Sequence, residues 1–98
     1  MADSGEALRA AVRRADGEAV ERLLAGHPET IDAPDQQFGN TALHWAVMGG
    51  YREIVLELLR TGADPNRRNR DGMTPLGLAA DFGLDEISAI LMDRGGRQ

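Results

Sequence analysis

The sequence predicts an all-α repeat protein, a solenoid of three stacked helix–turn–helix units. The first observation is a period: Thr41 and Thr74 are 33 residues apart, as are Gly50 and Gly83. A fixed period of this length is typical of stacked supersecondary units. The second observation is that apolar residues recur at helical spacing within each unit, and the third is that glycines divide each unit into two helices. The 98 residues are therefore expected to form one domain with a small core.

The N-terminal unit is predicted over residues 6–35, after a loose tail of residues 1–5. Leu8 and Val12 mark a first helix, and Asp16 stands where its side chain can cap a second. This unit matches the central unit at an offset of 35 residues rather than 33, so the extra length falls in the Pro- and Gly-containing loop after it. Its opening residues are polar and atypical, as expected of a terminal capping repeat.

The central unit, residues 36–68, is predicted to contain helices over about 42–48 and 52–60. The hydroxyl of Thr41 can cap the first helix, and Gly49-Gly50 ends it. Apolar side chains at helical spacing give the second helix a buried face.

The third unit, residues 69–98, repeats this order and is expected to close the stack. Thr74 is the predicted cap, Pro75 occupies the first helical position, where its missing N–H removes no hydrogen bond, and Gly83 separates the helices. The dipeptide Asp71-Gly72 predicts an exposed turn before this unit.

These motifs resemble the ankyrin repeat. Residues 41–46, TALHWA, match the family opening Thr-Pro-Leu-His-x-Ala with Ala in place of Pro, and residues 62–66, GADPN, match its helix-ending motif. Residues 74–76, TPL, match as well, but Gly77 stands where the family has His. The resemblance covers about residues 6–95. It implies β-hairpin-like finger loops between repeats, a hydrogen-bonding role for His44 and a non-catalytic, protein-binding function.

The composition of the chain argues against binding to nucleic acid or to membranes. The net charge of −5 does not suit nucleic acid or an anionic membrane. The cluster from Arg67 to Arg70 is either an anion contact or a solvated loop tip. All eleven basic residues are Arg, which we interpret as the composition bias of a GC-rich bacterial genome. The sequence has no apolar run that could span a membrane and no signal core at its acidic N-terminus, so a cytoplasmic protein is expected.

Catalysis and metal binding find little support in the sequence. There is no Cys, and neither His27 nor His44 belongs to a metal-ligand motif. We therefore predict no enzyme activity, no cofactor and no metal. Trp45 is the single Trp and is interpreted either as packing between repeats or as a partly exposed binding anchor.

The ankyrin resemblance implies that a partner protein docks on a concave face built by finger tips and inner-helix ends. Carried over by position, the candidate residues are Arg13, Arg14, Gln37, Phe38, Asn40, Met48, Arg68, Arg70, Asp71, Met73, Asp81 and Phe82. Their apolar members would form a centre within a charged rim, although Phe38 and Met73 could instead pack along the fingers. The predicted function is thus a scaffold-type protein-binding module. The alternative is a subunit that self-associates by stacking its repeats on those of another copy.

Overall fold

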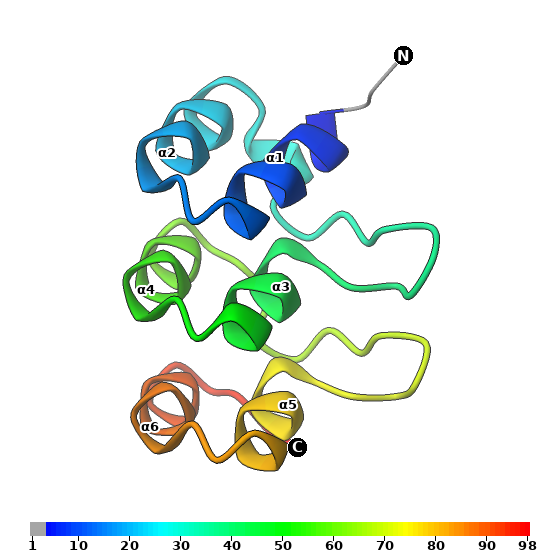
Figure 1. The fold of residues 1–98 in the computed structure, drawn as a ribbon, viewed down its shortest axis with the longest axis vertical. Coiled ribbons are helices and arrows are strands. Elements are labelled where there is room, and N and C mark those ends of the chain that lie inside the picture. Colours follow the sequence, from blue (N-terminus) through cyan, green and yellow to red (C-terminus); the bar gives the residue numbers. More distant parts are fainter. Residues whose placement is uncertain (1–3) are drawn as a thin grey trace.

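The structure is a computed structural model that describes residues 4–98, and six α-helices and one short 3-10 helix lie in this range (Figure 1). Their bounds are α1 Ser4–Arg13, α2 Gly17–Gly26, η1 Pro28–Thr30, α3 Ala42–Gly49, α4 Arg52–Arg60, α5 Pro75–Asp81 and α6 Asp85–Asp93. Each predicted unit contains one pair of α-helices. The prediction of an all-α repeat is therefore confirmed.

The helices stand in two rows, an inner row of α1, α3 and α5 and an outer row of α2, α4 and α6 (Figure 1). Helix α3 packs between α1 and α5, and α4 packs between α2 and α6. The loops that precede α3 and α5 project to the same side of the inner row (Figure 1). We call residues 35–40 the first finger and residues 69–73 the second finger. No strand is assigned within residues 4–98, so the fingers are hydrogen-bonded turns rather than β-hairpins.

The predicted caps begin the helices. Asp16 accepts a hydrogen bond from the Ala19 N–H at the start of α2, and Thr74 accepts one from the Gly77 N–H at the start of α5. At α3 the Thr41 hydroxyl and the His44 side chain accept reciprocally from each other's backbone N–H groups, which forms a capping box. These contacts satisfy donors that the first helical turn leaves unpaired.

The core lies between the two rows and runs through all three units. Its members are apolar positions of every α-helix, and the largest fully buried apolar side chains are those of Leu8, Val12, Val20, Leu43, Val47, Val55, Leu58 and Leu91. One unit alone could not bury both faces of its helix pair, so stacking supplies the burial that holds each pair together.

The start of α1 differs from the prediction. The helix begins at Ser4 rather than at Glu6, so the expected loose tail is wrong for Ser4 and Gly5, and the rest of that tail, residues 1–3, lies outside the described residues. Gly5 is buried in the first turn of the helix. Gly is a poor helix former, yet Gly5 is part of the helix in the folded chain.

A second difference concerns the turn inside the first unit. Gly50 has φ +70° where α3 ends, and the position 35 residues earlier is Ala15, which has φ +57°. Ala15 is the one non-Gly residue with positive φ within residues 4–98. The left-handed conformation brings its Cβ close to a carbonyl oxygen, which destabilises it by roughly 1–2 kcal/mol. The fold therefore imposes the turn on the first unit without the residue that suits it.

Candidate functional site

The first finger is organised by the carboxylate of Asp35. Its Oδ1 accepts backbone N–H groups from Phe38 at 2.6 Å and from Gly39 at 2.9 Å. Its Oδ2 accepts the indole N–H of Trp45 at 3.0 Å. Because Trp45 belongs to α3, this carboxylate ties the tip of the finger to an inner helix.

These contacts set the electrostatics of Asp35. Partial burial raises the pKa of the carboxyl group, but the hydrogen bonds from Phe38, Trp45, Asn40 and Gly39 outweigh that effect and hold the pKa below its ordinary value. Asp35 is therefore a carboxylate at neutral pH, and the finger tip depends on that charge.

Trp45 also contacts the first repeat. The guanidinium carbon of Arg13, at the end of α1, lies 5.0 Å from the centre of the indole ring, which is cation–π geometry. Arg13 additionally donates to Glu6 at 2.8 Å. The ring of Trp45 is half-buried. Both readings of Trp45 therefore apply in part, since it packs between repeats and also keeps some surface exposed.

The second finger forms around Asn69. Its side-chain oxygen accepts the N–H groups of Asp71 and Met73, both at 3.0 Å, and Arg68 donates to the Gly72 carbonyl at 2.7 Å. Gly72 has φ +76°, so the predicted turn at Asp71-Gly72 is confirmed.

The two fingers are joined edge to edge. The Arg70 N–H donates to the Phe38 carbonyl at 2.9 Å, and the Arg70 guanidinium donates to the Gln37 carbonyl at 2.9 Å. The Asn69 amide donates to the Asn40 side-chain oxygen, also at 2.9 Å. The fingers consequently form one continuous ledge. We call this ledge, together with the C-terminal ends of α1, α3 and α5, the finger face.

His44 links the second and third repeats from beneath the fingers. Its Nδ1 accepts the Thr41 N–H at 3.1 Å, and its Nε2 lies 2.9 Å from the Met73 carbonyl. Since a carbonyl can only accept, the proton is on Nε2. Burial lowers the pKa of His44, and the hydrogen bond to Met73 opposes that only in part. The structural role expected for His44 is confirmed.

All of the predicted partner-binding residues except Asn40 divide into three groups by exposure. Phe38 and Phe82 are large apolar side chains that remain 49% and 53% exposed. Met48 and Met73 are half-buried against the core. The polar members that are exposed are Arg13, Arg14, Gln37, Arg68, Arg70, Asp71 and Asp81.

Asn40 is a correction to the predicted set. It is only 5% exposed, and its side-chain oxygen is used by Asn69. It therefore shapes the fingers rather than offering a surface. Met73 also packs inward, because its methyl carbon lies 3.2 Å from where a Cβ on Gly77 would stand. The space opened by Gly in place of the family's His is thus filled by Met73, whereas Phe38 points its ring to the surface.

Sequence reasoning missed Asp35, which connects Phe38, Gly39 and Trp45. An Asp three residues before a Phe-Gly pair is a signal for an Asx turn, but nothing local indicates that its second oxygen reaches an indole ten residues away. The network thus joins Arg13, the first finger and the second finger. Met48, Asp81 and Phe82 lie at helix ends outside it.

The described part of the chain offers no group of three His, Cys, Asp or Glu side chains that could hold a metal ion. His27 is exposed beside Glu29 at 3.9 Å, and His44 is enclosed by its two hydrogen bonds. Over the same range, none of the helices has the length and apolar character needed to cross a membrane.

Comparison with known proteins agrees with the repeat architecture. A family model described as ankyrin repeats (3 copies) matches residues 8–97. Protein phosphatase 1 regulatory subunit 12A of Mus musculus is 40% identical over 76 residues, which is 78% of this chain and 7% of that protein. Oxysterol-binding protein-related protein 1 of Homo sapiens is 40% identical over 83 residues, 84% of this chain and 9% of that protein.

Inversin of Gallus gallus is 36% identical over 89 residues, which is 91% of this chain and 8% of that protein. The chain thus spans less than a tenth of the length of each of these three curated relatives. All three are vertebrate proteins, and the bacterial source expected from the absence of Lys stays a prediction.

Proposed function

The chain belongs to the ankyrin repeat family, whose repeats are protein–protein interaction modules, and on that premise we propose that it binds a partner protein through its finger face. The proposed role is that of a non-catalytic scaffold or adaptor in the cytoplasm. Nucleic acid is not the proposed partner, because the chain carries a net charge of −5.

The observation that carries this proposal is the exposure of Phe38 and Phe82. Each keeps about half of its surface in water, although a soluble surface gains nothing from two Phe side chains at a loop tip and a helix end. Aromatic side chains at such positions are typical of binding hot spots. Exposed arginines occur at neighbouring positions of the chain, Arg13 at the end of α1, Arg14 directly after it and Arg68 directly before the second finger, and they are proposed as a cationic rim.

The chemistry of the partner follows from this surface. It would cover the two Phe rings with apolar side chains and meet the arginine rim with carboxylates, because complementary charge favours encounter and register. Arg70 would contribute less than its exposure suggests, since its guanidinium already donates to the Gln37 carbonyl. The cluster at residues 67–70 is therefore proposed as part of the rim rather than as a separate anion site.

The names of the relatives support an adaptor role. Protein phosphatase 1 regulatory subunit 12A is named as a regulatory subunit, and its matched stretch is 7% of that protein. In line with that name, the proposed role of this chain is to bring partners together rather than to perform chemistry.

The test uses a partner captured from the source cell and then purified. We expect a Phe38→Ala, Phe82→Ala double variant to bind that partner at least about tenfold more weakly, because buried aromatic anchors contribute more than 1 kcal/mol each. Met92→Ala is the matched control, since Met92 is 58% exposed but lies on α6 in the outer row. Circular dichroism confirms that each variant folds. Unchanged affinity of the double variant would remove the finger face from the proposal.

A second candidate function, self-association, is favoured by one observation at the α5–α6 end. Met92 and Leu59 are 33 residues apart, and Leu59 is 7% exposed because the next repeat covers it, whereas Met92 is 58% exposed. Ala80, equivalent to the buried Val47, is exposed as well. A repeat from a second copy could cover this end. Light scattering at low and high concentration separates the two candidates, because a concentration-independent monomer excludes self-association.

A further inference from the structure

The three inner helices stack in one row, so their C-terminal ends follow one another along the molecule (Figure 1). Equivalent positions are 35 residues apart between the first and second repeats and 33 residues apart between the second and third. The ends can therefore be compared position by position. We call the side chains at these ends, with one ring that lies against them, the helix-end row: Arg13, Arg14, Met48, Tyr51, Asp81 and Phe82.

The charge of the side chain changes in order along the helix-end row. The position that holds Arg13 in the first repeat holds Met48 in the second and Asp81 in the third. Arg13 and Asp81 are exposed, and Met48 is half-buried against the core. The row is therefore basic at the end of α1, apolar at the end of α3 and acidic at the end of α5.

The next position extends the apolar part of the row. It holds Arg14 in the first repeat, Gly49 in the second and Phe82 in the third. The ring of Tyr51 occupies the space where a Cβ on Gly49 would stand, so an aromatic side chain covers the glycine. The rings of Tyr51 and Phe82 thus follow one another between the basic and acidic ends.

The two ends of the row each offer a charge that the chain does not use. Within residues 4–98, neither Arg14 nor Asp81 takes part in an ion pair. Arg13, in contrast, already pairs with Glu6 at 2.8 Å. Arg14 and Asp81 are therefore the charges of the row that remain available to a partner.

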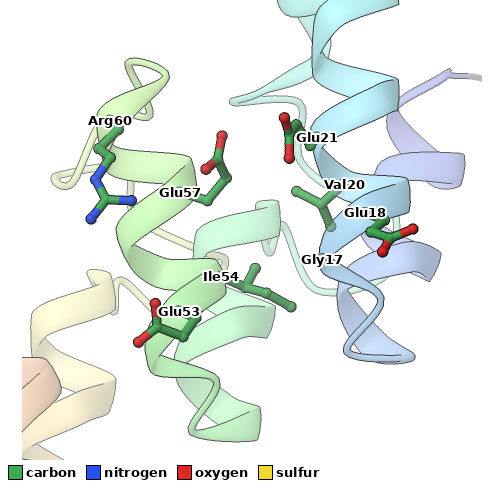
Figure 2. Close-up of a pocket in the computed structure, with 8 residues that line it drawn as sticks. All are labelled: Gly17, Glu18, Val20, Glu21, Glu53, Ile54, Glu57 and Arg60. Carbon is green, nitrogen blue, oxygen red and sulfur yellow. The ribbon is translucent and has the colours of Figure 1, made fainter.

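Other charged surfaces lack this order along the stack. Arg68 and Arg70 each donate to a backbone carbonyl of the fingers. In the outer row, the groove between α2 and α4 is lined by four glutamates and one arginine (Figure 2). Negative charge prevails there, so a cationic peptide held by net charge alone would collect in that groove.

We propose that the helix-end row binds an extended segment of the partner protein in one orientation of its charges. A carboxylate of the segment would lie beside Arg14, and a cationic side chain would lie beside Asp81. Apolar side chains between them would cover Met48, Tyr51 and Phe82, because an apolar centre with charges at its rim is the usual composition of an interface. This inference rests on the finger face as the binding surface and adds the order of the partner's charges.

The length of the row sets the spacing of those charges. Packed helices lie about 8–10 Å apart, so α1 and α5, with α3 between them, are about 16–20 Å apart. An extended chain advances about 3.3 Å per residue and presents every second side chain to the same face. The carboxylate and the cation of the segment are therefore expected about six positions apart, with two apolar side chains at the alternate positions between them.

The test is an NMR titration of the full chain with four capped heptapeptides: ESLSLSR, ESLSLSE, RSLSLSR and QSLSLSQ. We expect ESLSLSR to bind about two- to fivefold more tightly than each of the others, the span of one exposed ion pair. It should move amide signals of the helix-end row. Binding driven only by the net charge of −5 would instead favour RSLSLSR and move signals of α2 and α4.

A nitroxide label on the peptide tests its orientation. Attached beside the glutamate of ESLSLSR, the label should broaden the amide signal of Arg14 more than that of Phe82. Attached beside the arginine of the peptide, it should broaden Phe82 more than Arg14. The comparison holds for either chain direction of the peptide, because it follows the charged ends and not the termini.

Reversing one charge of the row should change which peptide binds best. Arg14→Glu makes both ends acidic, so RSLSLSR should become the tightest of the four. Asp81→Arg makes both ends basic, so ESLSLSE should become the tightest. Arg22→Glu on α2 and Asp93→Arg on α6 make the same charge changes on the outer helices and should leave ESLSLSR the tightest. Circular dichroism confirms that each variant folds.

Three results would overturn the proposal: equal affinity of the four peptides, the opposite broadening pattern from the labels, or an unchanged order of peptides in Arg14→Glu and Asp81→Arg. These results are separable from a failure of the finger face. Phe38 lies on the first finger outside the row, so Phe38→Ala should leave the order of the peptides unchanged, whereas it should weaken binding of the captured partner.

Discussion

Replacing Asp35 with Asn removes one charge from the residue that joins the first finger to α3. The wild-type carboxylate accepts the Phe38 and Gly39 N–H groups through one oxygen and the Trp45 indole through the other. Asn can keep one oxygen acceptor for the backbone. Its amide nitrogen is a donor, however, and cannot accept the indole N–H.

The magnitude follows from these contacts. Hydrogen bonds to a charged group contribute about 1.5–3 kcal/mol each, against roughly 0.5–1.5 kcal/mol for neutral ones. The two backbone bonds to Phe38 and Gly39 therefore weaken, and the bond to Trp45 is lost. Because Asp35 is partly exposed, water replaces some of this interaction. We expect the Asp35→Asn variant to lose about 2–3 kcal/mol of unfolding free energy, a large share of the roughly 5–15 kcal/mol typical of a domain.

Urea unfolding followed by tryptophan fluorescence measures this loss of stability. Trp45 is the single Trp of the chain, and it is also the residue whose hydrogen bond to position 35 the substitution removes. Asp32→Asn is the matched control. It makes the same charge change, but within the described residues the Asp32 carboxylate accepts a single hydrogen bond, from the Asp64 N–H at 2.9 Å in an exposed position. The control should lose less than about 1 kcal/mol, within the range of an ordinary hydrogen bond.

The two variants should also differ in how their unfolding free energy depends on pH. The folded-state pKa of Asp35 is below its ordinary value of 3.8, so its contribution is complete above that pH and is lost as pH falls through the lowered folded-state pKa. The unfolding free energy of Asp35→Asn should therefore fall less steeply at acidic pH than that of the wild type, and Asp32→Asn should keep the wild-type pH dependence. If Asp35→Asn matched the wild type in stability to within about 0.5 kcal/mol, the size of a typical surface effect, the assignment of Asp35 as the organising residue would be refuted.

Three further predictions use other parts of the chain. Burial keeps the folded-state pKa of His44 below 6.5, so the unfolding free energy should decrease as pH falls below that value. If a His44→Gln variant lost stability with falling pH as steeply as the wild type, this pH dependence would belong to another group. Ala15 and Gly50 both have positive φ, which strains a residue with a Cβ. Ala15→Gly should therefore raise the unfolding free energy by about 0.5–1 kcal/mol, and Gly50→Ala should lower it by about 1–2 kcal/mol. Equal stability of the two variants in chemical denaturation would contradict the strain argument. If copies stack through the α5–α6 end, Met92→Glu should lower the mass seen by light scattering at high concentration, whereas an unchanged mass would exclude that end as the contact.

Local sequence was sufficient for the elements and their order. The helix pairs, the caps at Asp16, Thr41 and Thr74, and the turn at Asp71-Gly72 were all predicted, because each depends on residues within a few positions of one another. The start of α1 was not predicted, because Gly has a low helix propensity, whereas Gly5 is buried within the first turn of the helix.

The candidate surface was predictable only in outline. The positions of Phe38 and Phe82 suggested exposure, and both are exposed. The sequence left open whether Phe38 and Met73 pack along the fingers, and of these two Met73 packs beside Gly77. Asn40 was predicted to be available, but its side chain is used by the neighbouring finger. Burial of such residues depends on a neighbouring repeat or finger, which the repeat pattern by itself does not place.

The sequence by itself determined that this chain is a stack of three helix pairs, since period, apolar spacing and capping are local properties that all indicate one architecture. Only the tertiary structure decided which side chains of different repeats form ion pairs and hydrogen bonds. Asp35 reaches Trp45, Arg52 pairs with Glu86 of the next repeat, and Arg70 joins the second finger to the first. Such pairings depend on the distance between side chains of different repeats, and that distance exists only after the repeats have stacked.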